Sequence, residues 1–275
     1  MAQNHIDIDD YSKKYLGEHT RIFSFEAVLS EIRTKQVLKS LNQHKHKHIL
    51  EVGCGLNPMF LYFNEYESCT IVEPVYEFYQ RAIKLAERRG NISIIHGYLE
   101  EVYKELLKSL DHSLDFIILS SVLHEVPNPR KLLQAVHKLC NRNTVVHINV
   151  PNVYSVHRLL AYEIGYIESI FEKSETEARF QRHTRFDKRL LFQMVEKSSF
   201  KVLSHGTYFI KPFSNEQMER IVDQEIAGKD IVKGLERMTK YMPDLGCEMF
   251  VDVRIKSAHS KAYHPPKAPK ISNAT

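Results

Sequence analysis

Short apolar runs alternate with longer amphipathic segments in the first half of the chain. The apolar runs predict strands at about His48–Val52, Ser68–Val72, Ile92–His96, Leu114–Ser120 and Thr144–Val150. The segments between them have apolar residues at helical spacing and predict helices from about Pro58 and over Glu77–Arg89, Leu99–Leu110 and Pro129–Cys140. Strands that alternate with helices in this way predict an α/β fold, in which right-handed crossovers build a doubly wound parallel sheet.

The two ends of the chain follow different patterns. Residues 1–10 are polar and are expected to fray, residues 11–43 have the apolar spacing of a helix, and residues 257–275 are expected to form a disordered tail. After the fifth predicted strand the alternation stops. The pattern there predicts, in order, two helix-like segments in 153–186, a helix over Asp187–Ser199 capped by Asp187, a strand over Phe200–Phe209, a helical stretch over Asn215–Tyr241 with weak breaks at Gly228 and Gly234, and a strand over Gly246–Lys256.

A glycine turn follows the first predicted strand, and an acid ends the second. Gly53 and Gly55 let the backbone approach a bulky ligand closely, and Glu73 lies about 20 residues beyond the turn, as in a nucleotide-binding βαβ unit. A dinucleotide fingerprint has a third glycine where this chain has Pro58. Glu51, just before the turn, would repel a pyrophosphate and attract a cationic ligand. The pattern therefore favours a positively charged nucleoside over NAD, with Glu73 accepting hydrogen bonds from ribose hydroxyls.

These residues resemble motif I of the class I S-adenosylmethionine-dependent methyltransferases, in which an acid precedes G-x-G. The resemblance implies a Rossmann-like, doubly wound seven-stranded sheet with an antiparallel last strand and helical cap insertions at 153–186 and 213–245. It divides the chain into an N-terminal helical lid (1–43), a methyltransferase domain (44–256) and the tail. It also implies methyl transfer from S-adenosylmethionine to a small molecule.

The resemblance assigns the residues that contact the cofactor. Glu51 is expected near its amino group, with the backbone of Gly53 and Gly55 near its methionine part. The other expected contacts are Asn57 in place of the usual third glycine, the ribose acid Glu73, the adenine-packing residues Pro74, Tyr98 and Leu99, and Ser120 and Ser121 at the methionine end. Many relatives have an acid where Tyr98 stands, so either Glu100 substitutes for it or backbone and stacking contacts alone hold the adenine.

Two histidines are candidates for the general base. His124 lies in the loop Ser120–Val126 and His157 in the stretch Asn149–Arg158, both of which resemble stretches of small-molecule methyltransferases at the carboxyl edge of the sheet. A neutral imidazole accepts a proton near pH 7, so His124 is the first candidate base and His157 its rival. The alternative for His124 is a hydrogen bond within the fold. Because both candidates are available, oxygen is the expected acceptor atom, and the resemblance suggests a sugar-linked substrate.

Several further residues are expected to contact the substrate. They are Tyr11 and Tyr15 in the N-terminal lid, Asn152 and Arg158 after the fifth strand, and Tyr208 near the end of the sixth. Arg158 is able to clamp a carboxylate or phosphate through two parallel hydrogen bonds. Arg182, His183 and Arg185 form a basic patch that is more typical of a solvated turn than of a site.

Composition limits the expected partners. Lys plus Arg total 38 and Asp plus Glu 34, a net charge of +4, and the basic residues form no stripe, so neither nucleic acid nor a membrane surface is an expected partner. The four cysteines show no CxxC pairing, which predicts reduced thiols, a cytoplasmic location and no metal site. The chain shows no signal peptide and no apolar run of membrane-spanning length. An NAD-dependent oxidoreductase and a non-catalytic methyltransferase-like partner subunit remain open, the second because of Asn57 and Tyr98.

Overall fold

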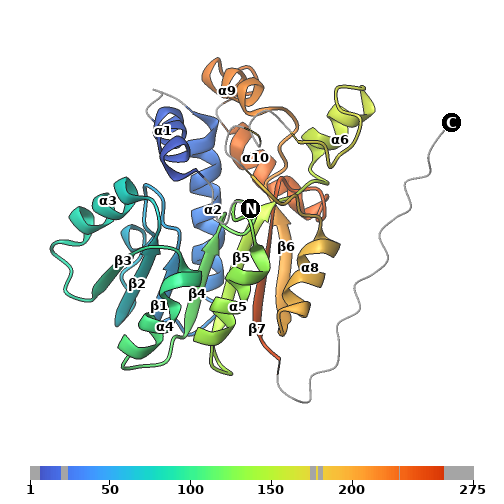
Figure 1. Ribbon diagram of the computed structural model, residues 1–275. Helices are drawn as coiled ribbons and strands as arrows, with labels where there is room; N and C mark the ends of the chain where they lie inside the picture. The colour runs from blue at the N-terminus through green and yellow to red at the C-terminus, as the bar shows by residue number, and fades with distance from the viewer. Residues whose placement is uncertain (1–6, 20–23, 174–177, 179–181, 229, 257–275) are drawn as a thin grey trace.

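The strands of the protein form one mixed sheet. A computed structural model describes residues 7–19, 24–173, 178, 182–228 and 230–256. Its strands are β1 His48–Val52, β2 Ser68–Glu73, β3 Ile92–His96, β4 Phe116–Ser120, β5 Val145–Pro151, β6 Phe200–Tyr208 and β7 Glu248–Ile255, in the spatial order β3-β2-β1-β4-β5-β7-β6 (Figure 1). β1 to β5 are parallel, and β7 pairs antiparallel with both β5 and β6. The predicted Rossmann-like sheet with an antiparallel last strand is confirmed.

Helices cover both faces of this sheet. They are α4 (Leu99–Ser109), α5 (Pro129–Leu139) and α8 (Lys188–Lys197) on one face, and α2 (Phe25–Leu41) and α3 (Tyr76–Ala86) on the other. Neighbouring strand residues point to opposite faces, so β1 places Leu50 in the first apolar cluster and Ile49 in the second. Burial on both faces is the reason that the central strands are continuous apolar runs in the sequence.

The N-terminal segment differs from the single helix predicted over residues 11–43. It contains two helices, α1 (Ile8–His19) and α2. Ser24 is the N-cap of α2, and its hydroxyl accepts a hydrogen bond from the Glu26 amide at 3.2 Å. A cap that satisfies one of the first free amides of a helix starts a new helix at this serine, which the apolar spacing alone did not show.

The helix predicted from Pro58 is also wrong, because only the 3-10 turn η1 (Met59–Leu61) is present there. The Met59 amide donates to the Glu51 carboxylate at 2.9 Å, and the Phe60 carbonyl accepts from Arg89 Nη1 at 2.6 Å. The Arg89 side chain therefore binds a carbonyl that a longer helix would pair internally, and Glu51 binds an amide that the start of a helix leaves unpaired.

The chain beyond β5 adds helices around the carboxyl ends of the parallel strands (Figure 1). They are α6 (Val156–Glu163), α9 (Asn215–Asp223), α10 (Ile231–Arg237) and the 3-10 turn η2 (Met238–Lys240). Asp187 caps α8 as predicted, since its Oδ1 accepts from the Leu190 amide at 2.6 Å. Gly228 separates α9 from α10, but Gly234 lies inside α10, so the break predicted there is wrong.

Three predictions fall partly or wholly outside the described residues. They are the fraying of residues 1–10, the second helix-like segment within 153–186 and the tail over 257–275. In the described part of the first, Ile8, Asp9 and Asp10 belong to α1, so the fraying predicted for them is wrong. Within the described part of the chain, no helix combines the length and the apolar character needed to cross a bilayer.

Candidate functional site

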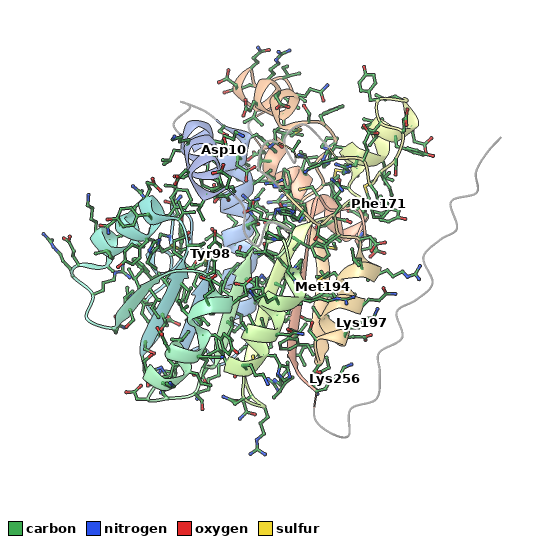
Figure 2. The ribbon with its side chains drawn as sticks, viewed as in Figure 1. Asp10, Tyr98, Phe171, Met194, Lys197 and Lys256 are labelled. Atoms are coloured by element: carbon green, nitrogen blue, oxygen red, sulfur yellow. The ribbon has the colours of Figure 1, made fainter. Side chains whose placement is uncertain are left out.

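A cavity lies at the carboxyl ends of β1, β2 and β4, below α1 and α2. Figure 2 labels Asp10 of α1 and Tyr98. Tyr98 lies on the side of the molecule that faces α1, far from Lys256. The predicted residues that line the cavity are Tyr11, Tyr15, Glu51, Gly53, Gly55, Asn57, Glu73, Pro74, Tyr98, Leu99, Ser120 and Ser121. The structure therefore brings together every residue assigned to the cofactor and the two tyrosines assigned to the lid.

The glycine turn has the geometry that its sequence predicts. Gly53 and Gly55 have φ values of 72° and 56°, in the left-handed region that other residues adopt only with strain. A Cβ built on Gly53 would lie 2.8 Å from Cγ2 of Val122, closer than real Cβ contacts. Because Val122, in the loop after β4, packs this closely against the turn, a side chain at position 53 would force Val122 or the turn to shift.

Two buried acids lie beside the turn. The Glu73 carboxylate accepts hydrogen bonds from the Val75 amide at 2.9 Å and the Gly55 amide at 3.0 Å, and its side chain lines the cavity. Burial raises the pKa of Glu73 above its ordinary value. Glu51 accepts one backbone hydrogen bond, from Met59, and burial together with the Glu73 charge raises its pKa to about 8. Both carboxyl groups therefore face a ligand that could supply positive charge or hydrogen-bond donors.

Tyr98 and Glu100 both line the cavity where the adenine is expected. Burial, followed by the charges of Glu101 and Glu100, raises the pKa of Tyr98 to about 12, so its hydroxyl stays protonated and able to donate. Both side chains reach the same space, so either one is placed to contact the adenine. That Glu100 takes the place of the acid that many relatives have at the position of Tyr98 stays a prediction.

A second wall of the cavity was not predicted as a unit. It consists of Glu26, Ser30, Arg33 and Thr34 from α2, Glu125 from the loop after β4, and Arg182. Arg33 forms ion pairs with Glu26 and, at 3.2 Å, with Glu248. Burial opposes the charge on Glu26, but the charges of Arg33 and Arg182, together with the hydrogen bond from Arg33, hold the pKa of Glu26 below its usual value. This wall therefore contains ionised side chains of both signs.

Helix α1 joins the two walls through aromatic and polar contacts. The Tyr11 hydroxyl donates to Glu125 Oε2 at 2.8 Å. The Tyr11 and Tyr15 rings stack with centroids 5.7 Å apart, and Tyr15 packs against Phe78 of α3 at 5.2 Å. Helix α1 thus covers the cavity from the Glu125 side to the nucleoside side.

The two histidines predicted as bases do not line the cavity among the described residues. His124 is 2% exposed, and neither of its ring nitrogens has a hydrogen-bond partner within the described chain. Its Nε2 lies 3.7 Å from Glu125 Oε1, and burial, with the charges of Arg182 and Arg33, lowers its pKa. Burial and then the charge of Lys211 lower the pKa of His157, whose Nδ1 also lacks a partner in the part of the chain described. Their catalytic roles stay predictions.

Three residues predicted to contact substrate also lie outside the cavity lining. Asn152 donates to the carbonyls of Asp244 at 3.1 Å and Gly246 at 2.9 Å, so its amide ties two loops together. Arg158 donates to the Ile170 carbonyl at 2.9 Å. Tyr208 is buried in the apolar cluster between α2 and α9.

Sequence reasoning missed Glu26, Arg33 and Glu125 as cavity residues, and it interpreted Arg182 as part of a solvated turn. Glu26 and Arg33 are separated by two helical turns, so both face one side of α2, but this spacing is equally common on solvated helices. The signal that identifies them is burial by other elements, which a single sequence does not contain.

Comparisons with known proteins agree with this geometry. A family model described as "Methyltransferase domain" matches residues 25–205, more than half of the chain. The plantazolicin methyltransferase BamL, solved with a triazolic desmethylPZN analog and SAH, is similar at a TM-score of 0.56 and 14% identity over 90% of each chain. The N-methyltransferase NodS from Bradyrhizobium japonicum WM9, in complex with S-adenosyl-L-homocysteine, is similar at a TM-score of 0.55 and 11% identity over 90% of this chain and 100% of that one.

A putative sarcosine dimethylglycine methyltransferase from Galdieria sulphuraria is similar at a TM-score of 0.52 and 14% identity, over 83% of this chain and 85% of that one. A comparison with curated protein sequences gave no match. The family match decides against the oxidoreductase, and the structural likenesses show the shared fold. The chain therefore belongs to the methyltransferase domain family, as a class I S-adenosylmethionine-dependent methyltransferase.

Proposed function

We propose that the protein transfers a methyl group from S-adenosylmethionine to a hydroxyl group of a small molecule, and that Glu125 receives the hydroxyl proton. The observation that carries this proposal is a cavity with two unlike walls. One wall contains the Gly53 turn with Glu51 and Glu73, and the other contains Tyr11 and Glu125. The first suits a cationic nucleoside, and the second suits the polar group that is to be methylated.

The first wall fits the cofactor on two observations. Only bare backbone fits at Gly53, and two buried carboxyl groups face the same space. We expect Glu51 to hold the amino group of the cofactor and Glu73 to accept hydrogen bonds from its ribose. When bound, S-adenosylmethionine supplies an electrophilic methyl group next to a positively charged sulfur.

Glu125 has the environment of a general base. Burial raises its pKa above the ordinary value, which brings the carboxylate closer to the strength needed at neutral pH. The Tyr11 hydroxyl donates to Oε2 and fixes the side chain, while Oε1 lies 3.7 Å from Arg182 Nε. The carboxylate is therefore oriented in the cavity and able to accept a proton from a hydroxyl beside it.

The proposal that oxygen is the methyl-accepting atom does not depend on the two histidines. In the sequence, His124 and His157 favoured oxygen, whereas here the carboxylate of Glu125 replaces them as the group that faces the cavity. His124 lies directly behind this carboxylate, which leaves it a supporting role in orientation. A sugar-linked hydroxyl is the narrower form of the proposal, since only the family resemblance suggests it.

An amine is the second candidate acceptor. Glu26 and Glu125 place two carboxylates on the acceptor side, and the charge of Arg33 is already matched by Glu26 and Glu248. A protonated amine entering here would be attracted by these carboxylates, in competition with Arg33 and Arg182. The bound amine must lose a proton before its nitrogen can accept the methyl group, and a carboxylate of this wall is the group that would receive that proton.

We also propose that α1 acts as the lid of the N-terminal unit, residues 1–43. Tyr11 reaches the acceptor wall, and Tyr15 packs on Phe78 at the nucleoside wall. A helix fixed at both walls excludes water from the space between them and holds the reacting groups in one geometry.

Paired acceptors test the acceptor atom. Each pair of acceptors contains one member with a hydroxyl group and one with an amine at the same position: a phenol glucoside and the matching aniline glucoside, and glucose and glucosamine. We would incubate the protein with S-adenosylmethionine and each acceptor, and measure formation of S-adenosylhomocysteine. The proposal expects turnover with the hydroxyl member of a pair, and exclusive methylation of the amine member would transfer it to the second candidate. No turnover with any small acceptor, despite tight S-adenosylhomocysteine binding, would contradict the small-molecule assignment.

The variant Glu125→Gln tests the base. It keeps the shape of the side chain and removes its basicity, so we expect turnover to fall about 100-fold with nearly unchanged S-adenosylhomocysteine affinity. Thr34→Val is the matched control, because Thr34 lines the same wall and its hydroxyl donates to the Ser30 carbonyl at 3.0 Å. Wild-type turnover by Glu125→Gln would rule out this residue as the base.

A further inference from the structure

A continuous chain of buried polar side chains crosses the centre of the sheet behind the cavity. It runs from Ser121, just after β4, through Asn149 and His147 of β5 to Asp252 of β7 and Ser40 of α2. Asn149, His147 and Asp252 are completely buried. None of these three lines the cavity within the described residues, so the function proposed above does not use them.

Asn149 is the residue that connects this chain to the cavity wall. Its Oδ1 accepts hydrogen bonds from the Ser121 amide at 2.9 Å and the Ser121 hydroxyl at 3.2 Å. Its Nδ2 donates to Ser120 Oγ at 3.0 Å. Ser121 has a φ of 58°, which costs a serine conformational energy, and the two hydrogen bonds that Ser121 donates to Asn149 offset that cost.

The orientation of the Asn149 amide is fixed from behind. Its Nδ2 lies 3.4 Å from His147 Nε2, and His147 Nδ1 lies 2.7 Å from Asp252 Oδ1. If Nε2 accepts from the amide, the ring proton must be on Nδ1, where it donates to the carboxylate. Rings of Phe116 and Phe250 stack on the imidazole with centroids 6.5 and 5.9 Å away, so the ring has little freedom to turn.

Asp252 is held in turn by two hydroxyls. Ser40 Oγ of α2 donates to Oδ1, and Ser204 Oγ of β6 donates to Oδ2, both at 2.6 Å. Carboxylate, imidazole and amide thus have one arrangement that satisfies all their hydrogen bonds. A buried polar network with a single satisfied arrangement is rigid, and here its free end is the wall that carries Ser120 and Ser121.

We propose that Asn149, oriented by His147 and Asp252, is a positioning residue that fixes the Ser120–Ser121 wall against the methionine part of the cofactor. This rests on the cofactor binding proposed above and on the expectation from the sequence that Ser120 and Ser121 contact the methionine part of the cofactor. The Val122 side chain that limits the space at Gly53 follows directly in the chain, so the same corner supports both the turn and the wall. Asn149 acts through Ser120 and Ser121 and does not itself touch the ligand.

Two probes separate positioning from general stability. S-adenosylhomocysteine contains the amino acid part of the cofactor, and 5′-methylthioadenosine contains only the nucleoside and the sulfur. We would measure the Kd of each probe by calorimetry for wild type, Asn149→Ala and Asn149→Asp, with urea unfolding of each protein. Ser204→Ala is the matched control, because it removes a hydrogen bond to Asp252 at the end remote from the cavity.

The expected result is selective. Asn149→Ala should bind S-adenosylhomocysteine about tenfold more weakly and 5′-methylthioadenosine as tightly as wild type, since losing the hydrogen bonds to Ser121 frees only the methionine side. Asn149→Asp keeps the acceptor oxygen for Ser121 and should recover part of the affinity. Ser204→Ala should unfold at lower urea but leave both dissociation constants unchanged.

Other results would overturn the inference. Equal weakening of both probes by Asn149→Ala, or no weakening, would make Asn149 a purely structural residue. If Asn149→Ala does not fold, His147→Phe gives the same comparison, because it keeps the ring stacking and removes the bond that orients the amide. Wild type that binds neither probe would overturn the cofactor assignment and this inference together, whereas wild type that binds both leaves the variants to decide.

Discussion

Glu51 makes cofactor binding depend on pH in a way that the structure lets us calculate. The carboxyl group is 3% exposed, and burial, followed by the nearby charge of Glu73, raises its pKa to about 8. The backbone hydrogen bond from Met59 favours the ionised form but does not outweigh burial. Glu51 is therefore mostly protonated at neutral pH in the free protein, whereas the cationic amino group of the cofactor needs it ionised.

The magnitude follows from the ionised fraction. A pKa of about 8 leaves roughly one part in a hundred of Glu51 ionised at pH 6 and about half at pH 8. If only the ionised form pairs with the ligand, affinity for S-adenosylhomocysteine should rise by about fiftyfold between these pH values. Binding at pH 6 should also release about one proton, because the pair forms only after Glu51 loses its own.

Glu51→Gln is the matched variant. It preserves the shape and the acceptor for the Met59 amide, and its affinity should change little between pH 6 and pH 8. The titration of the ligand's own amino group is common to both proteins, so the difference between them isolates Glu51. Calorimetry in two buffers of different ionisation enthalpy measures the proton release. Equal pH slopes for the two proteins, or no proton release by wild type at pH 6, would refute the reasoning.

The raised pKa of Glu51 also makes the stability of the folded protein depend on pH. The direction of this dependence is opposite to that produced by an acid whose pKa is lowered by an ion pair. Since the folded pKa of Glu51 lies above the unfolded value of 4.5, the folded state binds more protons, and stability falls as pH rises from about 4.5 to about 8. At pH 7 this penalty is of the order of 3 kcal/mol. Glu51→Gln should therefore unfold at higher urea than wild type at pH 7 and show little difference near pH 4.

Three further substitutions test the cavity. Gly53→Ala should lower the free energy of unfolding by about 1–3 kcal/mol and weaken S-adenosylhomocysteine binding, because its Cβ would meet Val122 at 2.8 Å. Urea unfolding measures the first effect and calorimetry the second. Wild-type values in both would show that the turn has room for a side chain. Glu73→Ala should weaken the same binding by about 1–3 kcal/mol, the loss expected for hydrogen bonds to a charged group, and unchanged affinity would remove the ribose assignment. His124→Ala should lower turnover less than tenfold at unchanged cofactor affinity, because Glu125 faces the cavity instead; a loss comparable to that of Glu125→Gln would restore His124 as the base.

The parallel strands could be predicted because the central ones are buried on both faces and all of them are short apolar runs bounded by turn residues. The run Ile92–His96 has the same bounds in the sequence prediction and in the structure. The two helix errors have a different origin. The break at Ser24 and the short turn at Met59 depend on hydrogen bonds that involve side chains, with Glu26 in one case and with Glu51 and Arg89 in the other. Apolar spacing reports which face of a helix is buried, and it carries little information about where the helix ends.

The wall of the cavity that contains Glu51, Gly53 and Glu73 could be predicted because one stretch of chain builds most of it. Gly53 and Glu73 belong to a single strand–turn–strand unit, so their positions in space follow from their positions in the sequence. The second wall of the cavity is not built by any single stretch of chain. Arg33 on α2, Glu125 after β4 and Arg182 meet only because three distant segments pack together at one edge.

The position of Glu125, which was not among the bases expected from the sequence, shows the physical limit of the sequence argument most clearly. Ser121 adopts a φ of 58°, which turns the chain sharply as it leaves β4, and the Glu125 amide then closes a turn onto the Val122 carbonyl at 2.9 Å. In such a turn adjacent side chains point in different directions. The glutamate therefore reaches the cavity while the histidine is buried behind it. The residue types after the strand predicted acid–base chemistry at this edge. The backbone angle at Ser121, which hydrogen-bonds to Asn149 of the neighbouring strand, accompanies a loop in which the glutamate and not the histidine lines the cavity.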